Sequence, residues 1–146
     1  GSITIDGRDI RDLDTREWRK LFGTVMQNGY LFDDTIESNI AEPDSNSLPD
    51  QDRLKEAIKI ANLTSTIEKM PKGIRTNIGP NGSSLSGGES QRIMIARMVY
   101  KNPQIIIMDE ATSSLDSNNE REIINNLETF LNKKTTIIIR YFGIVL

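Results

Sequence analysis

The 146-residue sequence contains no cysteine and no histidine. Without cysteine there are no disulfides and no thiolate metal sites. Without histidine there is no imidazole to act as a base, a metal ligand or a pH switch. No apolar run approaches the ~18 residues of a membrane-spanning helix. The N-terminus has neither a basic nor a hydrophobic leader region, so we expect no signal peptide.

The sequence also has fewer basic than acidic residues. The 18 Lys and Arg residues are outnumbered by 21 Asp and Glu residues, which gives a net charge of −3. Nucleic-acid-binding domains carry clustered positive charge, so the composition indicates that nucleic acid is not a partner. A length of 146 residues, with 36% hydrophobic and 27% charged residues, is typical of one globular domain.

A Gly-rich phosphate loop of the form GxxxxGK[ST] is absent from the whole sequence. Such a loop supplies backbone N–H groups and a lysine to the phosphates of a nucleotide. The absence matters because two other stretches suggest a nucleotide phosphate held between chains. They are NGSSLSGGESQR (81–92) and IIIMDEATSSLD (105–116).

The periodicity of the sequence predicts strands at 2–6, 22–26, 104–109 and 135–139, and helices at 15–21, 51–63, 65–70, 87–102 and 117–131. The last two strands are continuous apolar runs, which predict parallel strands covered on both faces. We therefore expect an α/β layer fold with a parallel core. Its core segments are 1–29 and 103–146, and 30–102 is expected to form an inserted helical subdomain.

Two acids end the apolar strand IIIMDE. Ligands of open parallel sheets bind beyond the carboxyl ends of the strands, where Asp109 and Glu110 are predicted to lie. An aspartate there can hold Mg²⁺ through oxygen, and the neighbouring glutamate can accept a proton from an attacking water. The alternative is that both acids simply cap a buried strand and face solvent.

The stretch LSGGE (85–89) leads into a predicted helix. Gly87 and Gly88 allow backbone N–H groups to approach an anion closely. Ser86 can cap the helix and contact a phosphate oxygen, and the helix N-terminus adds partial positive charge. The alternative is an ordinary Gly/Ser turn before a helix. The long string LSGGESQRIMIAR (85–97) favours the functional interpretation.

LSGGESQR followed by IIIMDEATSSLD resembles the signature motif, Walker B motif and D-loop of the nucleotide-binding domain of ATP-binding-cassette transporters. VMQNGYLFDDTIESNI (25–40) resembles the Q-loop and the start of the helical subdomain, in the form found in exporters. The resemblance covers the chain from Ile3 to Ile139. It implies a P-loop NTPase-like (RecA-like) parallel sheet core with an inserted α-helical subdomain.

The resemblance also implies roles for individual residues, with ATP and Mg²⁺ as cofactors. Gln27 would contact Mg²⁺ or the attacking water, Asp109 would support Mg²⁺, and Glu110 would be the general base. The signature residues would touch the γ-phosphate of ATP held by a second nucleotide-binding domain, in a head-to-tail dimer: Ser86, Gly87, Gly88 and Glu89. Glu89 stands where the family usually has glutamine. Residues 113–116, which include Asp116, would form the D-loop that crosses to the partner.

The sequence departs from the family at both ends. It has no phosphate loop before Ile3, and Arg140 follows the TTIII strand where the family has a histidine. We therefore expect a nucleotide-binding domain that is truncated at both ends. The tail RYFGIVL would arise from truncation or a frameshift. Such a chain is predicted to be inactive by itself.

Three functions compete at this point. The first is the motor ATPase of a membrane exporter, at the cytoplasmic face of a transmembrane domain whose coupling helix contacts LFDDTIESNI (31–40). The second is an ATP-gated clamp of the DNA-repair or chromosome-structure type, which also carries an LSGG signature. The third is a non-catalytic remnant. The exporter-like Q-loop region and the acidic composition favour the first over the second.

Overall fold

A computed structural model of the chain describes residues 1–41, 48–111 and 117–139, and within the last range the side chains from 120 onward. Asp116 and the other expected D-loop residues, 113–115, therefore lie outside the described residues. The C-terminal stretch 140–146 lies outside them as well.

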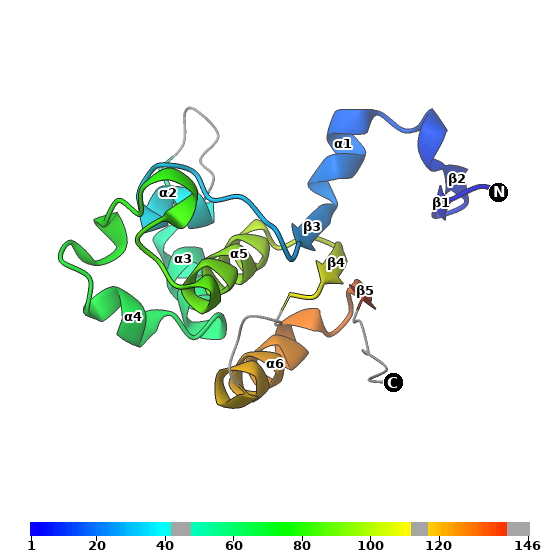
Figure 1. Cartoon of the computed structure of the whole chain (residues 1–146). Coiled ribbons are helices and arrows are strands. Elements are labelled where there is room, and N and C mark those ends of the chain that lie inside the picture. The colour runs from blue at the N-terminus through cyan, green and yellow to red at the C-terminus, as the bar shows by residue number, and fades with distance from the viewer. Residues whose placement is uncertain (42–47, 112–116, 140–146) are drawn as a thin grey trace, which may run out of the picture.

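The centre of the fold is a three-stranded parallel sheet (Figure 1). Strand β4 (Ile105–Asp109) lies between β3 (Phe22–Val25) and β5 (Thr135–Ile139). Val25 pairs with Met108, and Asp109 pairs with Ile139. All three strands run in the same direction, so their carboxyl ends meet at one edge of the sheet. This arrangement confirms the predicted parallel α/β core.

The prediction that the last two strands are covered on both faces is wrong for the described chain. In β4, Ile106 and Met108 are buried, whereas Ile105 and Ile107 on the opposite face are only half-buried. β5 is more open still, because it is an edge strand: Ile137, Ile138 and Ile139 are 43–52% exposed. An apolar run without alternation shows that a strand tolerates burial on both faces, but not that both faces are buried.

Four helices form a group beside the sheet (Figure 1). They are α2 (Ile36–Ala41), α3 (Gln51–Ile60), α4 (Thr64–Glu68) and α5 (Gly87–Lys101). α5 packs against α2 and α3 on one side and against β3 on the other. It ends before Asn102, which adopts the left-handed conformation that ends many helices. α5 thereby joins the helical group and the sheet in one hydrophobic core.

The remaining elements lie around this core. α6 (Ser117–Leu131) packs Ile123 and Leu127 against it, as its amphipathic pattern predicts. α1 (Thr15–Lys20) lies where a helix was predicted and is capped by Asp14. The strands β1 (Thr4–Ile5) and β2 (Arg8–Asp9) form a small antiparallel hairpin at the N-terminus. Three short 3₁₀ turns complete the described structure: η1 (Ile10–Asp12), η2 (Gly73–Arg75) and η3 (Pro80–Gly82).

Candidate functional site

The carboxyl edge of the parallel sheet brings three of the predicted site residues to one place. Asp109 is the last residue of β4, and Glu110 follows it directly. Gln27 follows β3 by two residues, and the pairing of Val25 with Met108 puts this segment beside the end of β4. The Gln27 side chain is exposed, whereas Asp109 and Glu110 are half-buried. The sheet edge therefore presents two carboxylates and one amide where open parallel sheets bind ligands.

Two hydrogen bonds hold the backbone of Glu110 in an uncommon conformation. Its φ angle is +46°, in the left-handed region that is costly for a residue other than glycine. Its N–H donates to the Ile139 carbonyl at 3.1 Å. Its own carbonyl accepts a hydrogen bond from Nε2 of Gln91, a buried residue of α5, at 2.9 Å. This second bond connects the beginning of α5 to the sheet edge.

The N-terminus of α5 is closed by a reciprocal cap between Ser86 and Glu89. The Glu89 N–H donates to Ser86 Oγ at 3.3 Å. In return, the Ser86 N–H and the Ser86 hydroxyl donate to Glu89 Oε2 at 2.8 and 2.7 Å. These two bonds, the backbone one first, hold the pKa of Glu89 below its ordinary range, and the charge of Arg92 lowers it slightly further. The Ser86 hydroxyl is thus donated to Glu89, and Gly87 and Gly88 occupy the first turn beside it.

We expect Glu89→Gln to destabilise the chain at neutral pH and to have a smaller effect in acid. The carboxylate accepts charge-assisted hydrogen bonds, which are stronger than those of an amide. Because folding lowers the pKa of Glu89, its contribution is fully present above the unfolded value, near 4.5, and is lost as the pH falls through the folded value. Urea unfolding at about pH 7 and about pH 3 measures the effect of Glu89→Gln on the unfolding free energy in both conditions. We expect a loss of about 0.5–1 kcal/mol at the higher pH.

A suitable control for this experiment is Glu56→Gln, which removes the same charge from an exposed position on α3. We expect it to change the unfolding free energy by less than about 0.5 kcal/mol. Equal losses in both variants, or a Glu89→Gln loss that is as large at about pH 3 as at about pH 7, would contradict the role of the cap.

A buried amide fixes the loop that follows Gln27. Asn39 in α2 is fully buried. Its Nδ2 donates to the carbonyls of Phe32 and Thr35 at 3.0 and 2.9 Å, and its Oδ1 accepts from the Phe32 N–H at 2.8 Å. Arg97 of α5 donates to the Asn39 carbonyl at 2.7 Å, to Asn39 Oδ1 at 3.0 Å and to the Tyr30 carbonyl at 2.9 Å. We call Asn39, Arg97 and the backbone of residues 30–35 the Asn39 network.

The Asn39 network presents two aromatic rings to solvent. Tyr30 and Phe32 are 59% and 49% exposed, and their rings pack edge to face with centroids 5.5 Å apart. The guanidinium of Arg97 lies over the Phe32 ring at 5.4 Å. Exposed aromatic residues on a rigid support are typical of a surface that contacts a partner.

The side-chain oxygens at the sheet edge are chemically suited to Mg²⁺. The Asp109 carboxylate and the Gln27 amide oxygen are hard donors of the kind Mg²⁺ prefers. In the described parts of the chain, no three His, Cys, Asp or Glu side chains come together as a metal-binding group. Mg²⁺ is usually held by one or two carboxylates, with phosphates and waters completing the shell. The residues present therefore suit an ion shared with phosphate.

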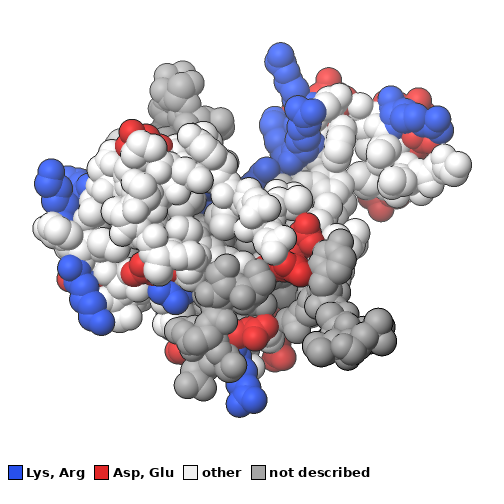
Figure 2. Space-filling view, in the orientation of Figure 1, with Lys and Arg blue, Asp and Glu red and all other residues white. Residues whose placement is uncertain are grey.

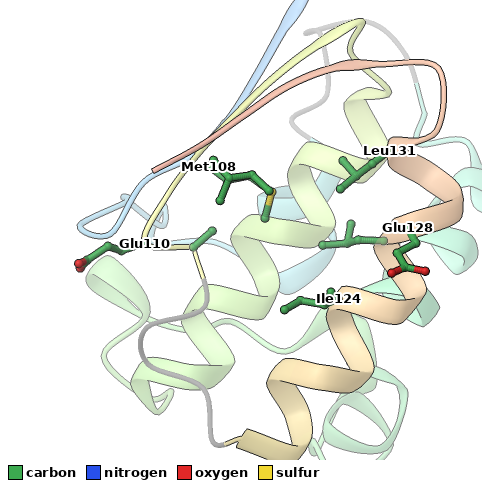
Figure 3. A pocket seen from close by; sticks show the side chains of 8 residues that line it. Met108, Glu110, Ile124, Glu128 and Leu131 are labelled. Carbon is green, nitrogen blue, oxygen red and sulfur yellow. The ribbon is translucent and has the colours of Figure 1, made fainter. Parts of the chain in front are cut away.

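An apolar cavity of about 220 Å³ lies between the ends of β4 and β5 and helix α6. Most of its lining is aliphatic, and Figure 3 shows Met108, Ile124 and Leu131 around it, with the Glu110 carboxylate directed away from these side chains. The cavity offers few donors for a phosphate. We therefore centre the candidate nucleotide site on the Glu110 carboxylate and not on the cavity.

Sequence reasoning missed the side chains that hold the site in place. It identified Gln27, Asp109, Glu110 and the residues of the α5 N-terminus, but gave no role to Gln91 or Asn39. Both are amides that are nearly or fully buried. The sequence does not signal the contacts that join different elements, because Glu110 lies 19 residues from Gln91 and Arg97 lies 58 residues from Asn39. The other side-chain partners of Asn39 are local, at Phe32 and Thr35.

A parallel core with acids and an amide at its carboxyl edge, joined there to a capped helix, fits an α/β fold of the P-loop NTPase-like class. The family model described as "ABC transporter" matches residues 1–113, and the chain belongs to the ABC transporter family.

Its relatives include several transporters. The ATP-dependent lipid A-core flippase of Burkholderia pseudomallei is 43% identical over 141 residues, which cover 97% of this chain and 23% of the flippase. The flippase of Vibrio parahaemolyticus is 44% identical, with 97% and 24% covered. ABC transporter B family member 13 of Arabidopsis thaliana is 42% identical, with 97% and 11% covered.

A solved structure has the same fold. It is a bacterial Atm1-family ABC exporter with ATP bound, similar with a TM-score of 0.91 and 38% identity. The match covers 97% of this chain and 24% of the exporter. The chain thus spans about a quarter of the length of its bacterial relatives.

Proposed function

We propose that the chain contributes to the ATP-hydrolysing motor of a membrane exporter. The observation that carries the proposal is the meeting of Gln27, Asp109 and Glu110 at the carboxyl edge of the sheet. In this proposal Asp109 and Gln27 hold Mg²⁺, which neutralises charge on the phosphates. Glu110 accepts a proton from the water that attacks the γ-phosphate.

The residues at the start of α5 form a second half-site in this proposal. Ser86, Gly87, Gly88 and Glu89 would face ATP held by a second nucleotide-binding domain, and Asp116 would reach the same partner. The 15-residue helix supports this role, because unpaired N–H groups and the helix dipole favour an anion at its N-terminus. To engage a phosphate, the Ser86 hydroxyl has to turn away from Glu89.

We also propose two structural units. Residues 1–29 and 103–146 would belong to the α/β core, and 30–102 would form the helical subdomain. The grouping of α2, α3, α4 and α5 beside the sheet supports this division (Figure 1). α5 of the helical unit packs against β3 of the α/β unit in one hydrophobic core. Because the boundary between the two units is packed in this way, we expect only small movements of one unit relative to the other.

The contact with a transmembrane domain is proposed at residues 31–40 and the neighbouring Tyr30. The exposed rings of Tyr30 and Phe32 and their support by the Asn39 network favour this surface. The motor would then lie at the cytoplasmic face of the membrane. Among the described residues, no helix has both the length and the apolar character needed to cross a bilayer. Flippases and a plant transporter match almost equally well, so identity does not select a cargo.

The charge distribution favours the exporter over a nucleic-acid clamp. On the face shown in Figure 2, the basic side chains form separate groups at the periphery, with acidic side chains near several of them. With a net charge of −3, the chain lacks the overall positive charge that attracts a phosphate backbone. The relatives named above are also all transporters.

The experiment that tests the proposal is a chimera. Residues 1–139 replace the matching segment of the Vibrio parahaemolyticus flippase, which is 44% identical. We expect the chimera to hydrolyse Mg²⁺-ATP, and Glu110→Gln to lower its kcat by about 100-fold or more because the general base is lost. The 146-residue chain alone, whose sequence has no phosphate loop, is expected to show neither turnover nor saturable binding in calorimetry with millimolar Mg²⁺-ATP.

The control in the chimera is Glu128→Gln, an exposed acid on α6, which should leave turnover unchanged. A folded chimera without ATPase activity would overturn the proposal. So would a Glu110→Gln chimera that keeps its full rate. Turnover by the 146-residue chain alone that disappears in Glu110→Gln would show that a phosphate loop is not needed.

A further inference from the structure

We propose that Gln91 is a positioning residue for Glu110, through which the start of α5 and the carboxyl edge of β4 are mechanically connected. The inference rests on the proposed function, in which Glu110 is the base of one half-site and the residues from Ser86 begin the other. Gln91 Nε2 donates a hydrogen bond of 2.9 Å to the Glu110 carbonyl. In this proposal, that bond orients the Glu110 side chain as the base.

Glu110 needs external support because its own conformation is unfavourable. A glutamate with φ of +46° is held there only when its surroundings determine it. The N–H of Glu110 is bound by the Ile139 carbonyl and the carbonyl by Gln91, so β5 fixes one side of the residue and α5 the other. The carboxylate branches from the Cα between these two peptide groups. Any rotation of either peptide therefore redirects it.

Water does not easily replace Gln91 in this contact. Gln91 is 2% exposed and its bond to the carbonyl of the half-buried Glu110 is part-buried, so a carbonyl that loses this donor is poorly compensated by solvent. Without Gln91 the peptide after Glu110 is expected to turn toward another partner, and the left-handed conformation loses one of its two supports. The effect is local, because the β4–β5 pairing up to Asp109 and Ile139 does not involve Gln91.

The same helix transmits position over a short distance. Gln91 follows Ser86 by five residues on one continuous helix, about 7.5 Å along its axis. A force on the capped first turn moves Gln91 with it, because a hydrogen-bonded helix is stiff over this length. A phosphate that pulls on Ser86 would thus shift the support of Glu110 in the same chain, and the two half-sites of one chain would be coupled.

Selective labelling can observe Glu110 alone in the 146-residue chain. Asp-Glu occurs only at 109–110, so ¹³C′-Asp with ¹⁵N-Glu labelling gives one carbonyl–amide cross-peak, which reports hydrogen exchange at the Glu110 amide. Glu-Ala occurs only at 56–57 and 110–111, so ¹³C′-Glu with ¹⁵N-Ala labelling gives two carbonyl–amide cross-peaks, one for each of these peptide bonds. The 56–57 peptide, which lies within α3, is an internal reference for the 110–111 peptide.

The test compares Gln91→Met, which keeps the length of the side chain and removes the donor, with Gln104→Met at an exposed position before β4. We expect Gln91→Met to accelerate exchange at the Glu110 amide by about tenfold, the effect of one lost hydrogen bond. The 110–111 cross-peak should shift while the 56–57 cross-peak stays in place. Gln104→Met should leave all three signals unchanged.

Unchanged exchange and an unmoved 110–111 cross-peak in folded Gln91→Met would overturn the proposal. Equal acceleration of exchange at the Glu110 and Ala57 amides would also do so, because it indicates general destabilisation instead of positioning. If Gln91→Met does not fold, the proposal is tested on the unmodified chain by NMR. A through-hydrogen-bond correlation between a Gln side-chain amide and the Glu110 carbonyl supports the proposal, and its absence overturns it. No nucleotide is present, so the result is independent of whether the chimera hydrolyses ATP.

Discussion

Replacing Asn39 with leucine is expected to destabilise the chain by about 3–5 kcal/mol. Leucine has a similar volume but makes none of the side-chain hydrogen bonds. The Phe32 N–H, the Phe32 carbonyl and one donor of Arg97 would lose a partner in the interior. Each buried polar group left unpaired costs about 1–3 kcal/mol. Domains of this size have about 5–15 kcal/mol in total, so the expected loss is a substantial share of the stability.

Urea unfolding followed by circular dichroism measures this loss. The matched control is Asn125→Leu, the same substitution at an exposed position on α6, which should change the unfolding free energy by less than about 0.5 kcal/mol. A loss below about 1 kcal/mol for Asn39→Leu would show that the loop finds other partners, and that the Asn39 network does not determine its position.

The Asn39 network matters for the proposed function because of where its partners lie. The loop it holds begins just after Gln27 and carries the exposed Tyr30 and Phe32 rings. Its other anchor, Arg97, lies on the same helix as Gln91 and Ser86. The proposed membrane contact and the proposed phosphate contact are therefore attached to one rigid helix. Tyr30→Ala and Phe32→Ala remove the exposed rings but leave Asn39 in place. They therefore test the proposed contact surface separately from the Asn39 network that supports it.

The second large effect is expected in the association state. The chain should self-associate at micromolar concentration, and Ile138→Lys should shift it toward a monomer. Among the described residues, β5 pairs only with β4 and its other edge meets no strand, and Ile137, Ile138 and Ile139 are about half exposed. Ile138 also borders the apolar cavity beside α6. Exposed flat apolar edges pair with other chains, and a lysine on the edge opposes this pairing.

Sedimentation velocity or light scattering across a concentration series measures the distribution. Ile3→Lys is the matched control, since Ile3 is 67% exposed on the N-terminal hairpin, away from the sheet. It should leave self-association unchanged. A monodisperse monomer of the unmodified chain would contradict the prediction. Equal effects of both lysines would indicate a general charge effect and not pairing at β5.

Much of the candidate site was predictable because its residues have local causes. The apolar run before Asp109 predicts a parallel strand, and parallel strands place their carboxyl ends together. That rule also predicts that Gln27, which follows another strand, lies at the same edge. Ser86 as the cap of α5 follows from a serine three residues before a glutamate, a known capping pattern. Whether these residues act on nucleotide remains a prediction that the chimera tests.

The errors and omissions have non-local causes. The exposure of β5 depends on which strand lies last in the sheet, and the apolar sequence TTIII carries no information on that order. The left-handed conformation of Glu110 was equally unpredictable, because its support comes from β5 and α5 together.

Neighbouring residues and composition account for the periodic elements, the helix caps, the acidic charge balance and the motifs that place the chain in its family. These properties can therefore be read along the chain. Chain folding is needed to explain why Gln91 bonds to Glu110, why Arg97 of α5 bonds to Asn39 beside the loop after Gln27, and why β5 is exposed. The reason is physical: a buried polar side chain must find partners within about 3 Å, and chain folding, not sequence spacing, brings those partners together.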